Sequence, residues 1–192
     1  MRILGVDPGS RLTGYGCVDV VQGHLRHVTH GTLKLADTHG KAVVPLEDRL
    51  HSIYEGLSEV IQKFKPQMMV VEKVFFAKNA LSALKLGQAR GVVMLTGKIH
   101  DLQIFEYSAT EVKSAVAGYG QADKEEVAKM VQLRIGKLEV ATWDASDGLA
   151  LAICHAHTFR GGKPDLQQIS VQRKRKKFSL AESVRICLPK KG

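Results

Sequence analysis

The chain has 192 residues, of which 44% are hydrophobic, so it is long enough for one well-buried domain but too short for two of ordinary size. Its net charge of +9 is unevenly placed: residues 1–159 carry 18 Lys and Arg against 17 Asp and Glu, whereas residues 160–192 carry 10 against 2. We therefore expect a nearly neutral domain over residues 1–159 and a basic, flexible tail over residues 160–192. The overall charge does not by itself argue that the domain binds nucleic acid.

The cysteines and the N-terminus exclude several other classes of protein. Cys17, Cys154 and Cys187 are odd in number and far apart, with no CxxC pair, which argues against a zinc site and a disulfide framework. The N-terminal apolar run is broken by Asp7, so it is neither a signal peptide nor a membrane span. We expect a cytoplasmic protein with no membrane partner.

The N-terminal part of the chain has the pattern of β-strands. The apolar residues 3–6 are followed by Asp7-Pro8-Gly9, which indicates a buried strand that ends at an acidic residue and a turn. Residues 15–21 and 25–35 are rich in Val, Thr and alternating polar residues, and they predict two more strands of a meander.

Further along, helices and strands alternate. Apolar spacings of three and four predict a helix over residues 45–64, and the apolar residues 67–71 predict a strand that ends at Glu72. Residues 80–100 are apolar on much of their circumference, which indicates a buried helix at a possible subunit contact. A strand over 103–107 follows, then two helices whose starts, at residues 108–111 and 123–126, have capping-box spacing. Residues 143–159 form the last predicted helix.

Four acidic residues suggest a common site. Asp144 and Asp147 are three residues apart, so on a helix their side chains share one face. Such a pair alone is ordinary, because helix first turns favour acids, and Asp7 or Glu72 alone would serve equally well as a turn or cap residue. Ligands of α/β folds gather at the carboxyl ends of strands, however, so the acids converge if the two strands are neighbours.

Converging carboxylates repel one another and need a cation to remain ionised. Hard oxygen ligands select Mg²⁺ or Mn²⁺ rather than zinc. Two such ions about 4 Å apart can activate a water and stabilise the departing oxygen of a phosphodiester. The four acids therefore predict a nuclease site with two magnesium ions, for which manganese could substitute.

Four motifs, found in order between residue 1 and about residue 159, resemble those of the RuvC family of bacterial Holliday junction resolvases. They are Gly5-Val-Asp-Pro-Gly9, Val71-Glu-Lys-Val-Phe-Phe76, Ala83-Leu-Lys-Leu-Gly-Gln-Ala-Arg-Gly91 and Asp144-Ala-Ser-Asp147. The resemblance implies an α/β, RNase-H-like fold of the retroviral-integrase superfamily, with a mixed five-stranded sheet and helices on both faces. It also implies that Asp7, Glu72, Asp144 and Asp147 bind the metal.

The resemblance further implies a homodimer that nicks two like-polarity strands of a four-way DNA junction symmetrically, in recombination and repair, together with the RuvA and RuvB branch-migration proteins. A dimer suits a junction with two-fold symmetry, because such a junction needs two equivalent active sites. The helix over residues 81–99 is our candidate for the dimer contact.

Several residues outside the acidic set are expected to contact DNA. Phe75 resembles the family aromatic that contacts junction bases, although a place in the core is the alternative. Lys113 and Lys124 resemble lysines beside the active site that neutralise phosphates, although lysines are often solvated surface groups. Three cations of the second and third motif regions would position the DNA backbone: Lys78, Lys85 and Arg90.

Other interpretations remain open at this point. The same fold could serve a nuclease that processes structured RNA. A sugar-kinase or actin-like ATPase would use Gly14 and Gly16 in a phosphate-binding hairpin, but it needs a second domain for which this chain has no room. A non-catalytic architectural DNA-binding protein would explain the basic tail and leave the acids without a purpose. We interpret His155 and His157 as structural or exposed, because their spacing splays them apart on a helix, about two turns from Asp147.

Overall fold

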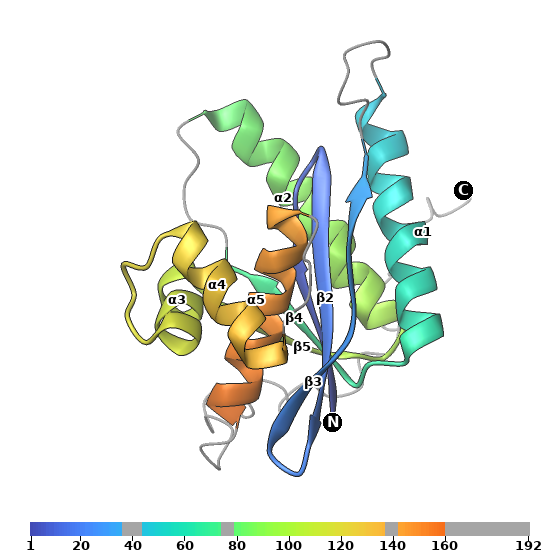
Figure 1. Ribbon diagram of the computed structural model, residues 1–192. Helices are drawn as coiled ribbons and strands as arrows, with labels where there is room; N and C mark the ends of the chain where they lie inside the picture. Colours follow the sequence, from blue (N-terminus) through green and yellow to red (C-terminus); the bar gives the residue numbers. More distant parts are fainter. Residues whose placement is uncertain (36–43, 74–78, 137–141, 160–192) are drawn as a thin grey trace, which may run out of the picture. The chain divides into compact units, whose positions relative to one another are not determined.

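The computed structural model describes residues 1–35, 44–73, 79–136 and 142–159 (Figure 1). The elements in chain order are β1 (Arg2–Asp7), β2 (Leu12–Val21), β3 (His24–Lys34), α1 (Leu46–Phe64), β4 (Met68–Glu72), α2 (Ala80–Ile99), β5 (Gln103–Tyr107), α3 (Ala109–Ala117), α4 (Lys124–Ile135) and α5 (Trp143–Phe159). The strands and helices expected from the sequence are therefore confirmed. The predicted basic tail, Phe75 and Lys78 lie outside the described residues.

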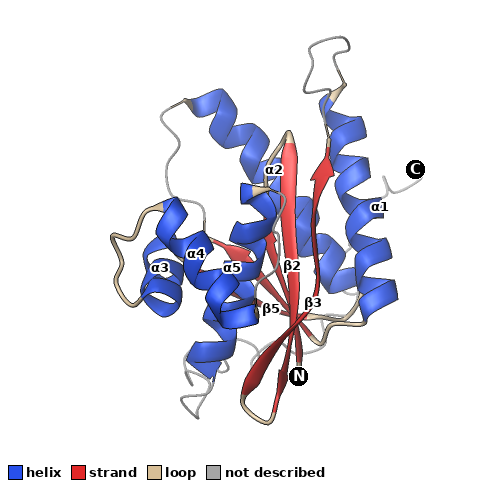
Figure 2. Cartoon of the chain, viewed as in Figure 1, coloured by secondary structure: helices blue, strands red, loops and turns tan. Residues whose placement is uncertain are grey.

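The strands form one sheet (Figure 2), and their order in it is β3-β2-β1-β4-β5. The meander β1-β2-β3 is antiparallel, whereas β1, β4 and β5 run parallel to one another. Val6 pairs with Val71, so β1 and β4 end side by side. The mixed five-stranded sheet implied by the resemblance is thus confirmed, and the two strands that end on acids are direct neighbours.

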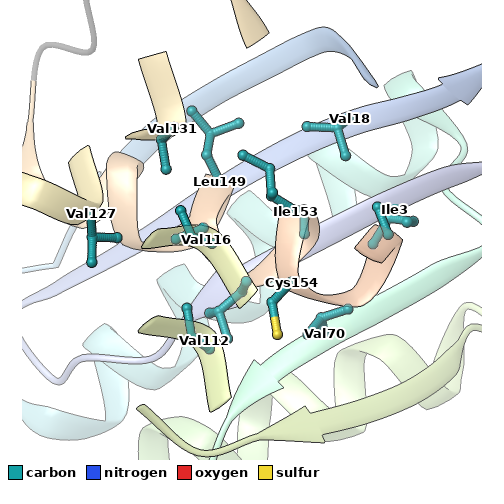
Figure 3. Close-up of a cluster of buried hydrophobic side chains, with 14 of the residues drawn as sticks. Ile3, Val18, Val70, Val112, Val116, Val127, Val131, Leu149, Ile153 and Cys154 are labelled. Carbon is teal, nitrogen blue, oxygen red and sulfur yellow. The ribbon is translucent and has the colours of Figure 1, made fainter. Parts of the chain in front are cut away.

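Helices cover both faces of this sheet, with α1 and α2 packed on one face and α3, α4 and α5 on the other (Figure 1). Because side chains alternate along a strand, Ile3 and Val70 pack into the core beneath α5 (Figure 3), while Leu4 packs toward α1 and α2. Asp7 and Glu72 continue the alternation of Ile3 and Val70. Both acids are therefore directed to the side of the sheet that carries α5.

Glycines bring the backbone of α5 directly against β1 and β2. A Cβ on Gly5 would lie 2.0 Å from the backbone oxygen of Gly148, and one on Gly14 would lie 1.9 Å from the backbone oxygen of Asp144. Real side chains cannot occupy such positions, so the helix lies close to the sheet only because these residues lack a Cβ. The start of α5 is thereby placed over Gly14, the cross-strand partner of Asp7.

The same packing corrects two expectations. The second strand begins at Leu12 rather than at Tyr15, because the glycines near its start are part of the strand. A Cβ on Gly16 would lie 2.5 Å from the backbone nitrogen of Leu149. Gly14 and Gly16 therefore accommodate a helix, which accounts for them without a phosphate-binding hairpin.

The prediction of a buried helix over residues 80–100 is wrong for the single chain. Within α2, the buried residues are Ala89, Val93, Thr96 and Gly97. Four large apolar side chains remain 52–61% exposed: Leu81, Leu84, Leu95 and Ile99. Apolar composition did predict the helix, but one of its faces packs on the sheet and another carries an uncovered apolar stripe.

Among the described helices, none is both long and apolar enough to cross a membrane.

Candidate active site

The positions of the acids follow from the ends of three elements. Asp7 is the last residue of β1 and Glu72 the last of β4. Asp144 and Asp147 lie near the start of α5, which Thr142 caps: its Oγ1 accepts a hydrogen bond from the backbone N–H of Ala145 at 3.3 Å.

The cap itself is held by the sheet. Oγ1 of Thr142 lies 2.6 Å from Oγ1 of Thr32 on β3, in a hydrogen bond between the two hydroxyls. This contact fixes the start of α5 relative to the edge of the sheet.

Three of the acids open into one cavity of about 160 Å³. Asp7, Glu72 and Asp147 line it together with Lys113 of α3 and Lys124 of α4, and apolar residues of α3, α4 and α5 complete its wall. Asp144 does not line the cavity, but its backbone lies over Gly14, beside Asp7. The structure thus brings together the acids and both lysines that the sequence singled out.

Burial and mutual repulsion disfavour charge on these acids. Burial, followed by repulsion from Glu72, Asp147 and Asp144, raises the pKa of Asp7 to about 8. Burial, followed by repulsion from Asp147, raises the pKa of Glu72, although a hydrogen bond with Asp7 opposes the rise. The three side chains are therefore close enough to affect one another's ionisation.

The two lysines reduce this repulsion. Nζ of Lys124 lies 3.2 Å from Oδ2 of Asp147 and acts against the burial that raises the pKa of Asp147. In return, Asp147 raises the pKa of Lys124. Lys113 and Lys124 both oppose the rise in the pKa of Glu72. Positive charge at this cavity thus stabilises the ionised acids, as a bound cation would.

The donor chemistry of the cavity suits a hard cation. Its acidic lining offers carboxylate oxygens, the ligands preferred by Mg²⁺ and Mn²⁺, and among the described residues no histidine or cysteine lines it. In the part of the chain that the structure describes, no three acidic, histidine or cysteine side chains stand close enough together to form a finished metal site. A bound cation would therefore have to bring these neighbouring carboxylates closer together.

The raised pKa of Asp7 predicts that metal-free protein loses stability as the pH rises. An unfolded Asp ionises near its ordinary value of 3.8, whereas folded Asp7 keeps its proton up to about pH 8. Between these values the folded state binds more protons, so the free energy of unfolding falls with rising pH and levels off above about pH 8.

Without metal, we therefore expect the free energy of unfolding of the wild-type protein to fall between about pH 5 and pH 8. The fall should exceed that of Asp7→Asn by at least about 1 kcal/mol. Thermal unfolding of both proteins across this range measures the difference. Added Mg²⁺ should reduce it, because a cation favours ionised Asp7. If the stability of the two proteins changed equally with pH in the absence of metal, the raised pKa of Asp7 would be contradicted.

The remaining candidates divide into three groups. Phe75 and Lys78 lie outside the described residues, and Lys85 lies half-buried on α2. Arg90 makes specific contacts within the protein: its Nε donates to the backbone oxygen of Glu72 at 3.3 Å, and its guanidinium forms an ion pair with Glu106 of β5. Glu106 has no distinguishing pattern in the sequence, because it is a lone acid in a strand.

The histidines have the structural role expected of them. His155 is buried in the core, and its Nδ1 lies 2.8 Å from the hydroxyl of Tyr107. Burial lowers the pKa of His155 to about 4, so it is neutral at ordinary pH. Nδ1 of His157 lies 3.0 Å from the backbone oxygen of Ala115. Neither residue lines the cavity of the acids.

Comparison with known proteins identifies relatives along most of the chain. A family model described as crossover junction endodeoxyribonuclease RuvC matches residues 3–155. The protein of that name from Syntrophotalea carbinolica is 52% identical over 83% of this chain and 96% of its own length. The one from Pseudomonas fluorescens is 49% identical over 81% of this chain and 86% of its own length.

Solved structures agree in fold. Thermus thermophilus RuvC in complex with a Holliday junction substrate is 33% identical, with a TM-score of 0.75 over 84% of this chain and 96% of its own. The yeast mitochondrial Holliday junction resolvase Ydc2, at 12% identity, has a TM-score of 0.58 over 81% of this chain and 78% of its own and supports the fold alone. The RNase-H-like fold is thus confirmed. With a family model spanning most of the domain and relatives half identical to it, the chain belongs to the RuvC family of crossover junction endodeoxyribonucleases, which are DNA-cleaving hydrolases.

Proposed function

We propose that this chain resolves four-way DNA junctions in recombination and repair by nicking two strands of like polarity symmetrically. The observation that carries the proposal is the convergence of Asp7, Glu72 and Asp147 on one cavity beside Lys113 and Lys124. The Thermus relative, whose structure was solved with a Holliday junction substrate, supports the choice of DNA.

In this proposal Asp7, Glu72, Asp144 and Asp147 hold two Mg²⁺ ions, or Mn²⁺ in their place. The ions supply the activation of water and the stabilisation of the departing oxygen. The burial of Asp7 and Glu72 at adjacent strand ends supports a cation site between them. Lys124 and Lys113 stand beside these acids, where they neutralise the phosphate at the cut and orient it toward the carboxylates.

The proposed DNA surface extends beyond the cavity. Phe75 would stack on unpaired junction bases, since it follows β4 by a few residues and the strand ends at the cavity. Lys78 and Lys85 would hold the phosphate backbone near the start of α2. RuvA and RuvB are the expected partners in branch migration, and the cytoplasm the expected location.

The decisive experiment is incubation with a synthetic four-way DNA junction with and without Mg²⁺. We expect paired nicks, placed symmetrically in strands of like polarity, that require the metal. A structured RNA of similar size serves as the alternative substrate. Cleavage of that RNA with intact DNA junctions would favour the RNA-processing alternative, and metal-independent binding without cutting would favour an architectural protein.

The exposed stripe of α2 supports a homodimer. Leu81, Leu84, Leu95 and Ile99 recur at helical spacing, and each is more than half exposed in the single chain. Two chains joined through this stripe would supply one active site for each cut of a two-fold junction.

We expect Leu84→Glu to weaken the dimer at least about tenfold, because it would bury an unpaired charge at the contact. Sedimentation velocity measures the change. Leu133→Glu is the matched control: Leu133 of α4 is 67% exposed and lies away from α2. A Leu84→Glu protein that remains as dimeric as wild type would exclude this stripe as the interface.

A further inference from the structure

Arg90 joins α2 to the ends of two strands. Its Nε donates to the backbone oxygen of Glu72 at 3.3 Å, and its Nη2 forms an ion pair with Oε1 of Glu106. The side chain of Arg90 is 24% exposed. One guanidinium thus contacts the last residue of β4 and a residue near the end of β5.

These contacts lie on the face of the sheet opposite the cavity. Ala89 and Val93, next to Arg90 on α2, pack into the core shared with α1, and Ile104 of β5 packs against the same core. Glu106 follows Ile104 in the strand alternation and so lies on the same face. Arg90 therefore contacts the Glu72 backbone from the face of the sheet opposite the cavity, while the Glu72 side chain faces the cavity.

The charge of Arg90 is already satisfied within the protein. Oε1 of Glu106 is buried, and the Arg90 guanidinium is the charged group that compensates it. An arginine used in this way keeps little freedom to turn toward a phosphate. This distinguishes Arg90 from Lys124, which is mostly exposed beside the cavity.

We infer that Arg90 is a positioning residue, which fixes the Glu72 carboxylate for metal binding through the Glu72 backbone, rather than a DNA-contacting cation. The inference rests on the proposed metal site. Groups that orient a ligand without touching the metal typically change metal affinity about 10- to 100-fold when they are removed. Because α2 also carries the exposed apolar stripe, Arg90 connects the proposed dimer contact to the site.

The test uses three variants of the full chain: Arg90→Gln, Glu106→Gln and the double variant. Mg²⁺ binding without DNA is measured by calorimetry and by fluorescence of Trp143, the one tryptophan, which adjoins Asp144. Junction affinity is measured without Mg²⁺, and cleavage is measured against Mg²⁺ concentration. Thermal unfolding reports stability separately.

For Arg90→Gln we expect Mg²⁺ binding about tenfold weaker, with kcat reduced more than KM changes and metal-free junction affinity within about twofold of wild type. The single variant leaves the buried Oε1 of half-buried Glu106 without its ion pair, so it also loses stability. The double variant should regain stability but not Mg²⁺ affinity, because the hydrogen bond to the Glu72 backbone is still missing.

Two outcomes would overturn the inference. Weaker metal-free junction binding with a lower salt dependence and an unchanged Mg²⁺ requirement would make Arg90 a phosphate contact. A double variant with wild-type Mg²⁺ affinity would leave Arg90 with a role in stability alone. Lys98→Gln, which removes an exposed cation from the same helix, should leave Mg²⁺ binding unchanged. If wild-type protein binds Mg²⁺ but cuts no junction, the proposed function fails, and the binding data still decide the role of Arg90.

Discussion

Asp7→Asn is expected to abolish junction cleavage and to leave junction binding intact. Asp7 is the most central of the acids, since Glu72, Asp147 and Asp144 all act on its pKa. The asparagine amide has nearly the same shape as the carboxylate that it replaces but cannot serve as a charged metal ligand. The DNA-contacting surface is therefore unchanged. Loss of about 4 kcal/mol of transition-state stabilisation corresponds to a rate about a thousandfold lower.

Single-turnover cleavage with saturating enzyme measures this loss, and gel-shift assays without Mg²⁺ measure binding. Because metal-free Asp7 keeps its proton up to about pH 8, the substitution changes little charge beside the phosphates, and junction binding should equal that of wild type. Glu59→Gln is the matched control, because Glu59 is an exposed acid of α1 on the opposite side of the sheet. Cleavage by Asp7→Asn at the wild-type rate would refute the metal assignment.

Gly5→Ala is expected to destabilise the fold strongly. The added Cβ would meet the backbone oxygen of Gly148 at 2.0 Å and the backbone nitrogen of Ala152 at 2.7 Å, and backbone cannot move aside as a flexible side chain can. Helix α5 would have to shift away from β1. We expect a loss of about 3 kcal/mol or more, a fall in Tm of roughly 6–12 °C, and impaired cleavage at temperatures where the protein stays folded.

Gly87→Ala provides the contrast. Gly87 lies within α2, and a Cβ there would meet nothing within 4 Å, so the substitution should stabilise the helix by about 0.5–1 kcal/mol. Chemical denaturation of both variants gives the two free energies of unfolding. Equal stabilities of Gly5→Ala and wild type would mean that α5 does not depend on this close contact.

Much of the fold could be predicted because local patterns dominate it. Apolar residues at every second position predict strands, and apolar residues three or four positions apart predict helices. The capping boxes at Ser108 and Asp123 predict two helix starts that the structure confirms. The candidate site followed from acids at strand ends, since that argument needs only the adjacency of β1 and β4. The resemblance then supplied the expected strand arrangement.

The remaining features depend on contacts between distant segments. Glycines in β2 resemble turn residues in sequence, and their purpose emerges only when α5 is placed over them. The sequence suggests a subunit contact on α2 but not which residues are exposed, because apolar residues at a protein contact and in the core look alike in a sequence. Likewise, the pairing of Arg90 with β4 and β5 cannot be read from the sequence, where Arg90 looks like any other cation.

The direct seating of α5 on the strands has a consequence for redesign of this protein. Backbone meets backbone at Gly5 and Gly14, so no side chain acts as a spacer between the strand that ends at Asp7 and the helix that carries Asp144. Substitution of valines and leucines in the core beneath α5 can therefore change the thermal stability of the domain while the spacing between these acids stays the same.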